Sequence, residues 1–223
     1  MSRVVFLIDG FNMYHSLVDA HNTLGIYAKW LDLHSLCRSY IPLFGKDAVL
    51  EEVHYFSAFA HHKNDASVIK RHEAYKNCLE DAGVITHMGR FKARTTQCPL
   101  SGKIDDGDPA IQCPLGGHFT RHDEKETDVA IAVKLCELVH KKRAEIIVLV
   151  TGDTDLTPAV RLCNEDSPKT TVLFAFPYKR SNAELKRLAP KSFEISIDAY
   201  KRHQFHNPMI LSDGRQINKP SSW

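Results

Sequence analysis

Two apolar segments of this sequence are followed at once by acidic residues. Asp9 ends the run RVVFLI, and Asp153 and Asp155 come just after the run AEIIVLV. Short continuous apolar runs are typical of strands that are covered on both faces of a parallel sheet. In such a sheet, ligands bind outside the carboxyl ends of the strands, where the strand order reverses. If these two strands are neighbours, their acids converge on one cleft.

Two more polar residues belong to the same edge of the expected sheet. Asn12 lies three residues after Asp9, and Asp128 lies in the first turn of a helix expected at TDVAIAVKLCELVHKK. Two like charges about 4 Å apart repel by roughly 4 kcal/mol at an effective dielectric constant near 20, so clustered carboxylates call for a cation. Oxygen ligands with open positions suit Mg²⁺ or Mn²⁺, which activate water for attack on a phosphodiester. The sequence therefore predicts a divalent-metal site for hydrolysis.

Each of these acids also has an ordinary structural explanation. Asp9-Gly10 fits a simple turn, and Thr151-Gly152-Asp153 fits a loop before a helix capped by Asp155. Asp128 suits the positive end of a helix dipole. Their coincidence at expected strand and helix ends is what favours a site.

Strands and helices alternate along the chain. The patterns predict strands at 3–8, 49–60, 84–91, 144–150, 170–176 and 193–196, and helices at 12–20, 30–40, 65–82, 127–142, from 156 and at 183–188. The helix at 127–142 is apolar around most of its circumference, so we expect it to be well buried. This alternation implies an α/β fold, with a parallel sheet of about five to six strands and helices on both faces.

One segment interrupts the alternation. Residues 92–124 are rich in Gly, Pro, Asp and Thr and lack a sustained period, so we expect an irregular insertion there. We therefore expect one domain over 1–200 that contains this insertion, followed by an irregular, basic C-terminal tail at 201–223.

The bulk composition sets limits on the class of protein. With 223 residues, 43% hydrophobic and 25% charged, the chain suits one globular domain and not a disordered one. No apolar run approaches the roughly 20 residues that span a bilayer, so no membrane partner is expected. The six cysteines lack the dense pairing of a secreted scaffold, which favours reduced, buried thiols and a cytoplasmic location.

Four motifs follow one another along the chain. They are IDGFN at 8–12, EKETDVAIA at 124–132, TGDTDLTPAV at 151–160 and FAFPYKRSNAEL at 174–185. Together they resemble the NYN domain of the PIN-like nuclease superfamily, in particular its LabA-like bacterial branch. The resemblance extends from Val4 to about Ile197, and the order D-G-x-N, K-x-x-D, [ST]-G-D-[ST]-D is what makes it specific.

The resemblance implies a Rossmann-like PIN fold and metal-dependent cleavage of RNA, which we expect to be single-stranded. It implies that Asn12 orients water or substrate, and that the metal is bound directly or through water by Asp9, Asp128, Asp153 and Asp155.

Other matched positions are candidates for substrate contact. Thr151 and Thr154 stand where small hydroxyl residues line the site in similar proteins. Lys125 and Ser181 match positions near the cleft, where they are candidates for phosphate contact.

Further basic residues are candidates for RNA binding. Arg90, Lys92 and Arg94 follow a strand and are interleaved with Phe91, so they could hold a backbone while the ring stacks on a base. A solvated, charged strand end explains them equally well. A wider basic rim is expected from Lys179, Arg180, Lys186, Arg187, Lys201 and Arg202, and His61 and His62 could approach the mouth of the cleft.

The insertion also contains potential zinc ligands. Cys98, Cys113, His118 and His122 supply two thiolates and two imidazoles, as in a tetrahedral zinc site. The cysteines stand singly, whereas the resembling family often carries C-x-x-C in this insertion. Ordinary loop cysteines are therefore the favoured explanation.

Two other functions compete with a metal-dependent ribonuclease. A haloacid-dehalogenase-like phosphatase also places Asp after an apolar strand, but it needs D-x-D and position 11 is Phe. A non-catalytic PIN-like protein could bind RNA or regulate without cutting, although four acids are hard to justify in a pure binder. The sequence does not decide between a monomer and a homo-oligomer.

Overall fold

The computed structural model describes residues 1–60, 65–97 and 118–223. The predicted strands and helices are all present, with ends shifted by a few residues. The strands are β1 (Ser2–Asp9), β2 (Ala48–Ala58), β3 (Val84–Gln97), β4 (His118–Lys125), β5 (Ile146–Val150), β6 (Thr171–Phe176), β7 (Phe193–Glu194), β8 (Met209–Ile210) and β9 (Gln216–Ile217). The helices are α1 (Gly10–Leu24), α2 (Leu33–Tyr40), α3 (Ala66–Asp81), α4 (Thr127–His140), α5 (Thr157–Asp166), α6 (Ala183–Leu188) and α7 (Ile197–Arg202), with 3-10 turns at Ile41–Phe44 and Thr154–Leu156.

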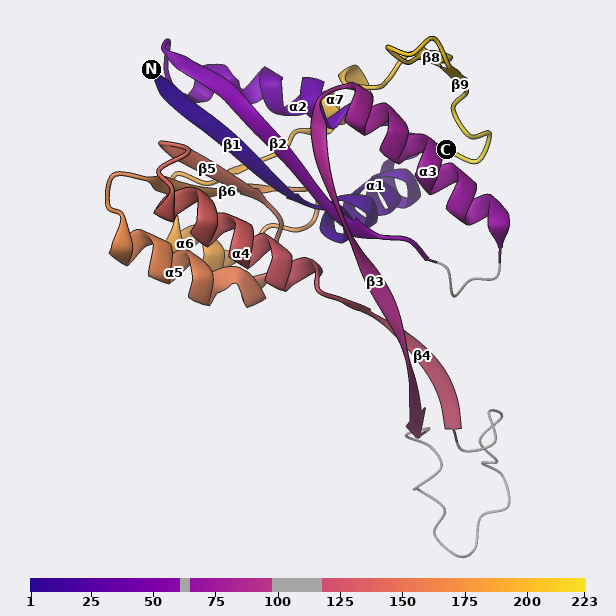
Figure 1. Cartoon of the computed structure of the whole chain (residues 1–223), viewed down its shortest axis with the longest axis horizontal. Helices are drawn as coiled ribbons and strands as arrows, with labels where there is room; N and C mark the ends of the chain where they lie inside the picture. Colours follow the sequence, from indigo (N-terminus) through magenta and orange to yellow (C-terminus); the bar gives the residue numbers. More distant parts are fainter. Residues whose placement is uncertain (61–64, 98–117) are drawn as a thin grey trace, which may run out of the picture.

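The main sheet has seven strands in the order β4-β3-β2-β1-β5-β6-β7, and every neighbouring pair except β3–β4 is parallel. The strand order reverses between β1 and β5, which pair as expected. Helices α4 and α5 lie together on one face of the sheet, and α1, α2 and α3 lie on the other (Figure 1). The α/β class is confirmed, and a switch point lies at the carboxyl ends of β1 and β5.

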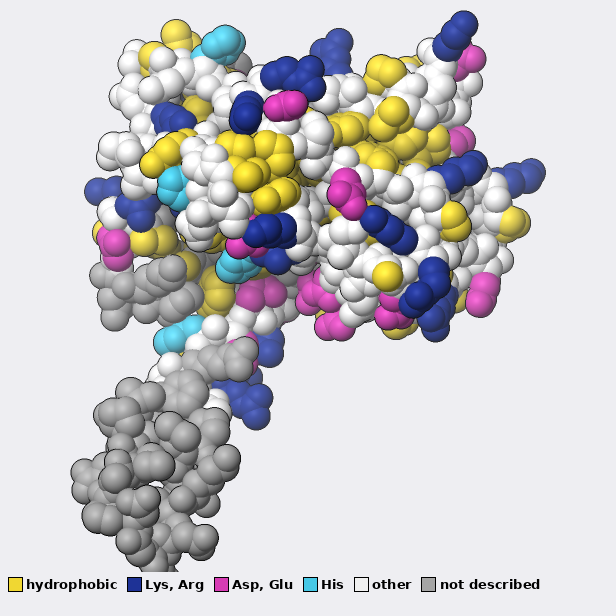
Figure 2. All heavy atoms as spheres, turned by 180° about the vertical axis from the view of Figure 1, so that it is seen from behind, with side chains coloured by type: hydrophobic (Ala, Val, Ile, Leu, Met, Phe, Trp, Pro, Cys, Tyr) yellow, Lys and Arg dark blue, Asp and Glu magenta, His cyan; other side chains and the backbone are white. Residues whose placement is uncertain are grey.

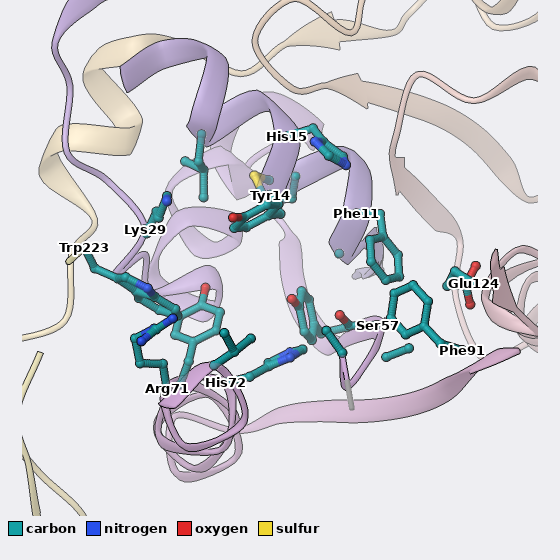
Figure 3. A pocket seen from close by; sticks show the side chains of 18 residues that line it. Phe11, Tyr14, His15, Lys29, Ser57, Arg71, His72, Phe91, Glu124 and Trp223 are labelled. Atoms are coloured by element: carbon teal, nitrogen blue, oxygen red, sulfur yellow. The ribbon is translucent and has the colours of Figure 1, made fainter. Parts of the chain in front are cut away.

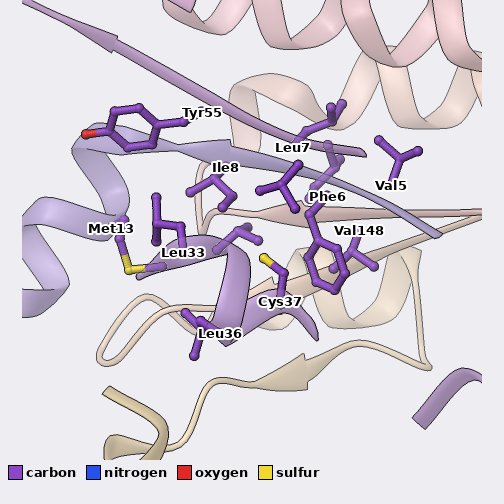
Figure 4. Close-up of a cluster of buried hydrophobic side chains, with 14 of the residues drawn as sticks. Val5, Phe6, Leu7, Ile8, Met13, Leu33, Leu36, Cys37, Tyr55 and Val148 are labelled. Atoms are coloured by element: carbon purple, nitrogen blue, oxygen red, sulfur yellow. The ribbon is translucent and has the colours of Figure 1, made fainter. Parts of the chain in front are cut away.

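The core explains why the first apolar run forms a central strand. The side chains from Val4 to Ile8 are all buried, because β1 has a strand on each side and helices on both faces. Figure 4 shows Phe6 and Ile8 of β1 facing Leu33 and Cys37 of α2. Gly83, with φ of 91°, ends the α3 region in the left-handed conformation that glycine adopts without strain.

The sheet contains one strand more than the sequence predicts, because β4 lies within the expected irregular insertion. β3 runs on to Gln97 and pairs antiparallel with β4, and the two form an arm that projects from the body of the sheet (Figure 1). The arm is residues 90–97 and 118–125. Since it is largely solvent-exposed on both faces, its strands lack the apolar alternation that signals a half-buried strand. The rest of the predicted insertion lies outside the described residues.

Helix α4 is less buried than its apolar sequence predicts. Val129 and Val133 are 67% and 62% exposed, whereas Ile131, Leu135 and Leu138 are buried against the sheet. One side of the helix therefore leaves apolar side chains in solvent.

The segment predicted as an irregular tail folds back onto the domain. It contains part of α7 and the β8–β9 hairpin, and Phe205 is buried. Trp223 packs with its ring 6.0 Å from Trp30 and 5.5 Å from Tyr75. The division into a domain and a tail at residue 200 stays a prediction. Among the described residues, no helix combines the length and the apolar character needed to cross a bilayer.

Tyr200 of α7 ties this C-terminal segment to the rest of the domain, which makes it a test of the packing. Its buried hydroxyl lies 2.9 Å from the Ser16 hydroxyl and accepts a hydrogen bond from the backbone N–H of Tyr178 at 3.1 Å. Tyr200→Phe leaves both groups without this partner, so we expect a loss of about 1–3 kcal/mol in unfolding free energy. Thermal denaturation measures it, and Tyr40→Phe, which also removes an acceptor but at an exposed site, should cost less. Equal losses in the two variants would contradict the prediction.

Candidate metal centre at the switch point

The Asp9 carboxylate is the centre of a hydrogen-bond network at the end of β1. Its Oδ1 accepts from the backbone N–H groups of Phe11 and Asn12, both at 3.0 Å, so Asp9 caps α1. Its Oδ2 accepts from Asn12 Nδ2 at 2.5 Å and from Thr151 Oγ1 at 2.9 Å. A carboxylate has about four lone-pair positions, and these four bonds occupy them all. With 3% of its surface exposed, Asp9 is an interior anchor.

The network continues into the loop after β5. Asn12 Oδ1 accepts from the backbone N–H of Gly152 at 3.2 Å, and Thr151 Oγ1 accepts from that of Asp153 at 3.1 Å. Asp153 Oδ1 in turn accepts from the N–H of Asp155 at 3.0 Å and caps the 3-10 turn. The loop that carries both acids is therefore fixed to the start of α1 through Asp9 and Asn12.

The third acid enters from α4. Asp128 lies in the first turn of that helix, as predicted. Glu124 precedes it and accepts hydrogen bonds from the backbone N–H of Thr127 at 3.1 Å and from the Thr127 hydroxyl. These bonds satisfy part of the helix start and fix the direction in which Asp128 leaves it.

Carboxylate oxygens of Asp128, Asp153 and Asp155 lie within 4.8 Å of one another, and we call these residues the carboxylate group. Two oxygens on opposite sides of a Mg²⁺ ion are about 4.2 Å apart, given bonds of about 2.1 Å. The three donors are thus nearly close enough to share one ion. Asp155 is exposed and the other two are half-buried, which leaves open positions for water and substrate.

The electrostatics of the group agree with cation binding. Burial, together with the acidic neighbours Asp9, Asp153, Glu124 and Asp155, raises the pKa of Asp128 to about 6, and burial is the largest cause. Burial also raises the pKa of Asp9, although its hydrogen bonds act in the opposite direction. In Figure 2 acidic side chains gather beside the root of the arm, while lysines and arginines lie on the arm. The oxygen-only donor set fits Mg²⁺ or Mn²⁺.

Two glycines allow the loops to approach closely enough to form the network. A Cβ atom on Gly152 would lie 2.0 Å from the carbonyl oxygen of Arg180, and one on Gly10 would lie 2.6 Å from that of Phe56. Gly10 is therefore more than a turn residue, because it lets α1 begin against β2 and leaves Asp9 facing the loop after β5.

Comparison with protein families identifies the domain. The family model named NYN domain matches residues 3–196. The chain belongs to the NYN domain family. This family lies within the PIN-like nuclease superfamily, so membership supports a nuclease-type hydrolase with RNA as its partner.

A solved structure supports the fold of this NYN domain. A crystal structure of a protein of unknown function from Vibrio parahaemolyticus is 14% identical in sequence, with a TM-score of 0.54, and the match covers 88% of this chain and 94% of that one. At this identity the likeness concerns the fold alone. No curated protein matches the chain.

The other predicted contact residues fall in different places. Thr151 is buried inside the network, so its hydroxyl serves the loop, whereas Thr154 lies half-buried in the 3-10 turn beside the carboxylate group. Lys125 is exposed at the end of β4, with Nζ 3.9 Å from Asp123. Ser181 is exposed and hydrogen-bonded to Glu194, beside β7.

The structure places the predicted basic residues of β3 and the ring of Phe91 on different faces of the strand, and their contact with RNA stays a prediction. Arg90, Lys92 and Arg94 alternate with Phe91, and side chains at alternate strand positions point to opposite faces. Phe91 packs edge-on against Phe11, with ring centroids 5.8 Å apart, while Arg90 pairs with Glu126 at 2.8 Å on the other face. A base on Phe91 and a phosphate on these cations would lie on opposite sides of the arm.

Several members of the predicted basic rim already have local partners. Lys186 pairs with Glu194, Lys201 lies 3.8 Å from Asp198, and Arg180 pairs with Asp19 at 2.6 Å. Arg187 and Lys179 are exposed, as is Arg202. The backbone of Arg180 is packed against Gly152, in the loop that carries Asp153.

The remaining predictions concern residues that the structure places only in part. Cys98, Cys113, His61 and His62 lie outside the described residues. His118 and His122 belong to β4, and the zinc site stays a prediction. The described cysteines are free thiols, and Cys37, Cys78 and Cys163 are buried as expected, with Cys136 half-buried.

Glu124 borders the carboxylate group, although the sequence-based prediction does not place it there. Its charge raises the pKa of Asp128, and its carboxylate accepts hydrogen bonds from the backbone N–H and the hydroxyl of Thr127 at the start of α4. It is the last residue of the segment that the sequence predicts to be irregular, where no such contacts are expected.

Because the pKa of Asp128 is raised, we expect the substitution Asp128→Asn to stabilise the protein by an amount that depends on pH. Because its folded-state pKa of about 6 exceeds the ordinary 3.8, the contribution of Asp128 to stability is present below about pH 4 and is lost as the pH rises through 6. In EDTA at pH 7.5, Asp128→Asn should raise the unfolding free energy by about 1 kcal/mol, a value reduced for partial solvent exposure. This corresponds to about 2–4 °C in melting temperature, and the gain should vanish near pH 4. Asp198→Asn, at an exposed acid in the first turn of α7, is the control and should give no gain. An equal gain for Asp128→Asn at both pH values would contradict the prediction.

The Thr151 hydroxyl can be tested by shape-matched substitutions. Thr151→Val removes the donor to Asp9 and the acceptor for the N–H of Asp153, in a residue that is 1% exposed. We expect a loss of about 1–3 kcal/mol in unfolding free energy, whereas Thr151→Ser keeps the hydroxyl and should lose less. Denaturant unfolding measures both, and a valine variant as stable as the serine variant would show that the network does not hold the loop.

Proposed function

We propose that this NYN domain is a metal-dependent ribonuclease that hydrolyses RNA phosphodiester bonds at the carboxylate group. The observation that carries the proposal is the convergence of Asp128, Asp153 and Asp155 at the switch point of the sheet. Family membership supports the hydrolase class and RNA as the partner. Assignment to the LabA-like branch is part of the proposal and rests on the four motifs.

In this proposal Asp128, Asp153 and Asp155 hold Mg²⁺ or Mn²⁺. A bound divalent cation supplies activation of a water nucleophile and offsets charge on the leaving oxygen. Asp9 acts indirectly: its hydrogen bonds position Asn12 and the loop after β5, and its charge adds to the negative potential that attracts the cation. Asn12 holds Gly152 through Oδ1, so it acts on the site by fixing the backbone of this loop.

The arm supports a path for the RNA backbone. Arg90, Lys92 and Arg94 are exposed along one face of β3, and Arg90 pairs with Glu126 just before α4, the helix that carries Asp128. Cations in a row attract phosphates without reading the bases, which suits an extended single strand. We propose a cytoplasmic location, because the six cysteines lack the dense pairing of a secreted scaffold.

Cleavage assays with labelled single-stranded RNA, structured RNA and single-stranded DNA test this function. We expect Mn²⁺- or Mg²⁺-dependent cleavage of single-stranded RNA, and at least about a 100-fold loss of rate in EDTA or in Asp153→Asn, because the cation and a ligand are removed. Asp198→Asn is the matched control and should cleave at the wild-type rate.

The outcomes separate the possible functions. Cleavage that survives both EDTA and Asp153→Asn would contradict the metal mechanism. RNA binding without cleavage of any substrate would contradict the enzyme and favour the non-catalytic RNA-binding protein. Thermal stability adds a second measurement, since Mn²⁺ should raise the melting temperature of the wild type more than that of Asp153→Asn.

A further inference from the structure

A pocket of about 430 Å³ lies beside the carboxylate group, between α1, α3 and the end of β2. Pockets of this size commonly hold small organic ligands. Gly10, which follows Asp9, lines one wall, and so does Glu124, whose charge acts on Asp128. The pocket and the carboxylate group are therefore two sides of the same junction between β1, the arm and α4.

The walls of the pocket are aromatic. Phe11 and Phe91 face each other edge-on at one end, Trp223 lies at the other, and Tyr14 lies between them (Figure 3). Tyr14 is 44% exposed, although its ring is large and mostly apolar. Exposed rings in a pocket are what single-stranded RNA uses for base stacking.

A polar group in the pocket is placed to read the edge of a flat ring. Ser57 and His72 line the wall opposite Tyr14 (Figure 3). Since Ser57 is buried and hydrogen-bonded to Tyr55, His72 is that group. Burial lowers the pKa of His72 to about 4, so its neutral ring offers one donor and one acceptor near pH 7.

The charge of the pocket favours a phosphate-bearing ligand. Of the described residues that line it, Lys29 and Arg71 are the cations and Glu124 is the acid. Lys29 Nζ lies over the face of the Tyr14 ring, 5.4 Å from its centre. A base that takes the place of the ammonium group on this face would leave that cation beside its own phosphate. Stacking surface and positive charge thus occur together here, which they do not on the arm.

We propose that this pocket binds one nucleobase of the RNA substrate, next to the phosphate held at the carboxylate group. The inference rests on the proposed ribonuclease function and adds a site of base recognition to it. Tyr14 supplies the stacking surface and Lys29 a contact to the adjoining phosphate. An RNA chain would then pass from the exposed cations of the arm, across the carboxylate group, into this pocket.

Binding of short single-stranded RNAs with one abasic residue at successive positions tests the proposal. Fluorescence anisotropy is measured in EDTA with Asp153→Asn, so that the RNA stays intact, and with the same variant carrying Tyr14→Leu, Lys29→Gln or Tyr27→Leu. We expect Tyr14→Leu to weaken binding about tenfold, as for the loss of one stacked base. One abasic position should weaken binding to Asp153→Asn by a similar factor and have no effect once Tyr14 is replaced. Tyr27→Leu, at an exposed tyrosine outside the pocket, is the control and should bind as Asp153→Asn does.

Two further measurements extend this test. Lys29→Gln should make the dependence of log binding constant on log salt concentration less steep by about 0.7, the value for one phosphate contact with a single strand. AMP and UMP test the other source of the same chemistry: tight binding of free nucleotides without oligonucleotide binding would assign the pocket to a free nucleotide and overturn the proposal. An abasic penalty that is the same with and without Tyr14 would also overturn it.

Failure of this proposal is distinguishable from failure of the ribonuclease function. If RNA is cleaved at the carboxylate group and Tyr14→Leu changes neither KM nor binding, the nuclease stands and the base site is wrong. If no RNA is cleaved but binding depends on Tyr14 and on one base, the base site stands and the nuclease is wrong.

Discussion

A buried carboxylate that accepts four hydrogen bonds holds the functional end of this domain together. Burying a charge is costly unless hydrogen bonds compensate, and Asp9 receives them from the start of α1 and from Thr151 after β5. It thereby joins the two central strands at the point where the sheet reverses its order. Its charge also raises the pKa of Asp128. The same residue thus builds the loop that carries Asp153 and Asp155 and helps to make the cleft attractive to a cation.

The arm provides the basic and aromatic surfaces beside the carboxylate group. β3 passes through the sheet and continues into the arm, and β4 returns from it to begin α4 with Asp128. The alternation of side chains along β3 separates a face with Arg90, Lys92 and Arg94 from a face with Phe91. The first face extends the basic surface beside the acids, and the second closes one end of the aromatic pocket. In the proposed function, β3 therefore offers cations to the RNA backbone on one face and a wall of the base pocket on the other.

The sequence could predict the positions of the acids, because strand ends and helix starts are local signals and parallel topology brings them to one edge. It could not predict that Asp9 turns inward while Asp128, Asp153 and Asp155 converge, since this depends on contacts between segments 142 residues apart, such as Thr151 with Asp9. β4 was missed because an exposed strand carries no apolar period. The exposure of Val129 and Val133 was missed for a related reason: an apolar sequence does not reveal whether a neighbour covers that side of the helix.

The most direct test of the central claim is a crystal structure of the protein grown with Mn²⁺, with the ion located by its anomalous scattering. We expect one manganese peak bonded to carboxylate oxygens of Asp128, Asp153 and Asp155, with Asp9 still accepting its four hydrogen bonds from Phe11, Asn12 and Thr151. A manganese ion bound directly by Asp9 with these bonds broken, or no peak at the carboxylate group, would contradict it.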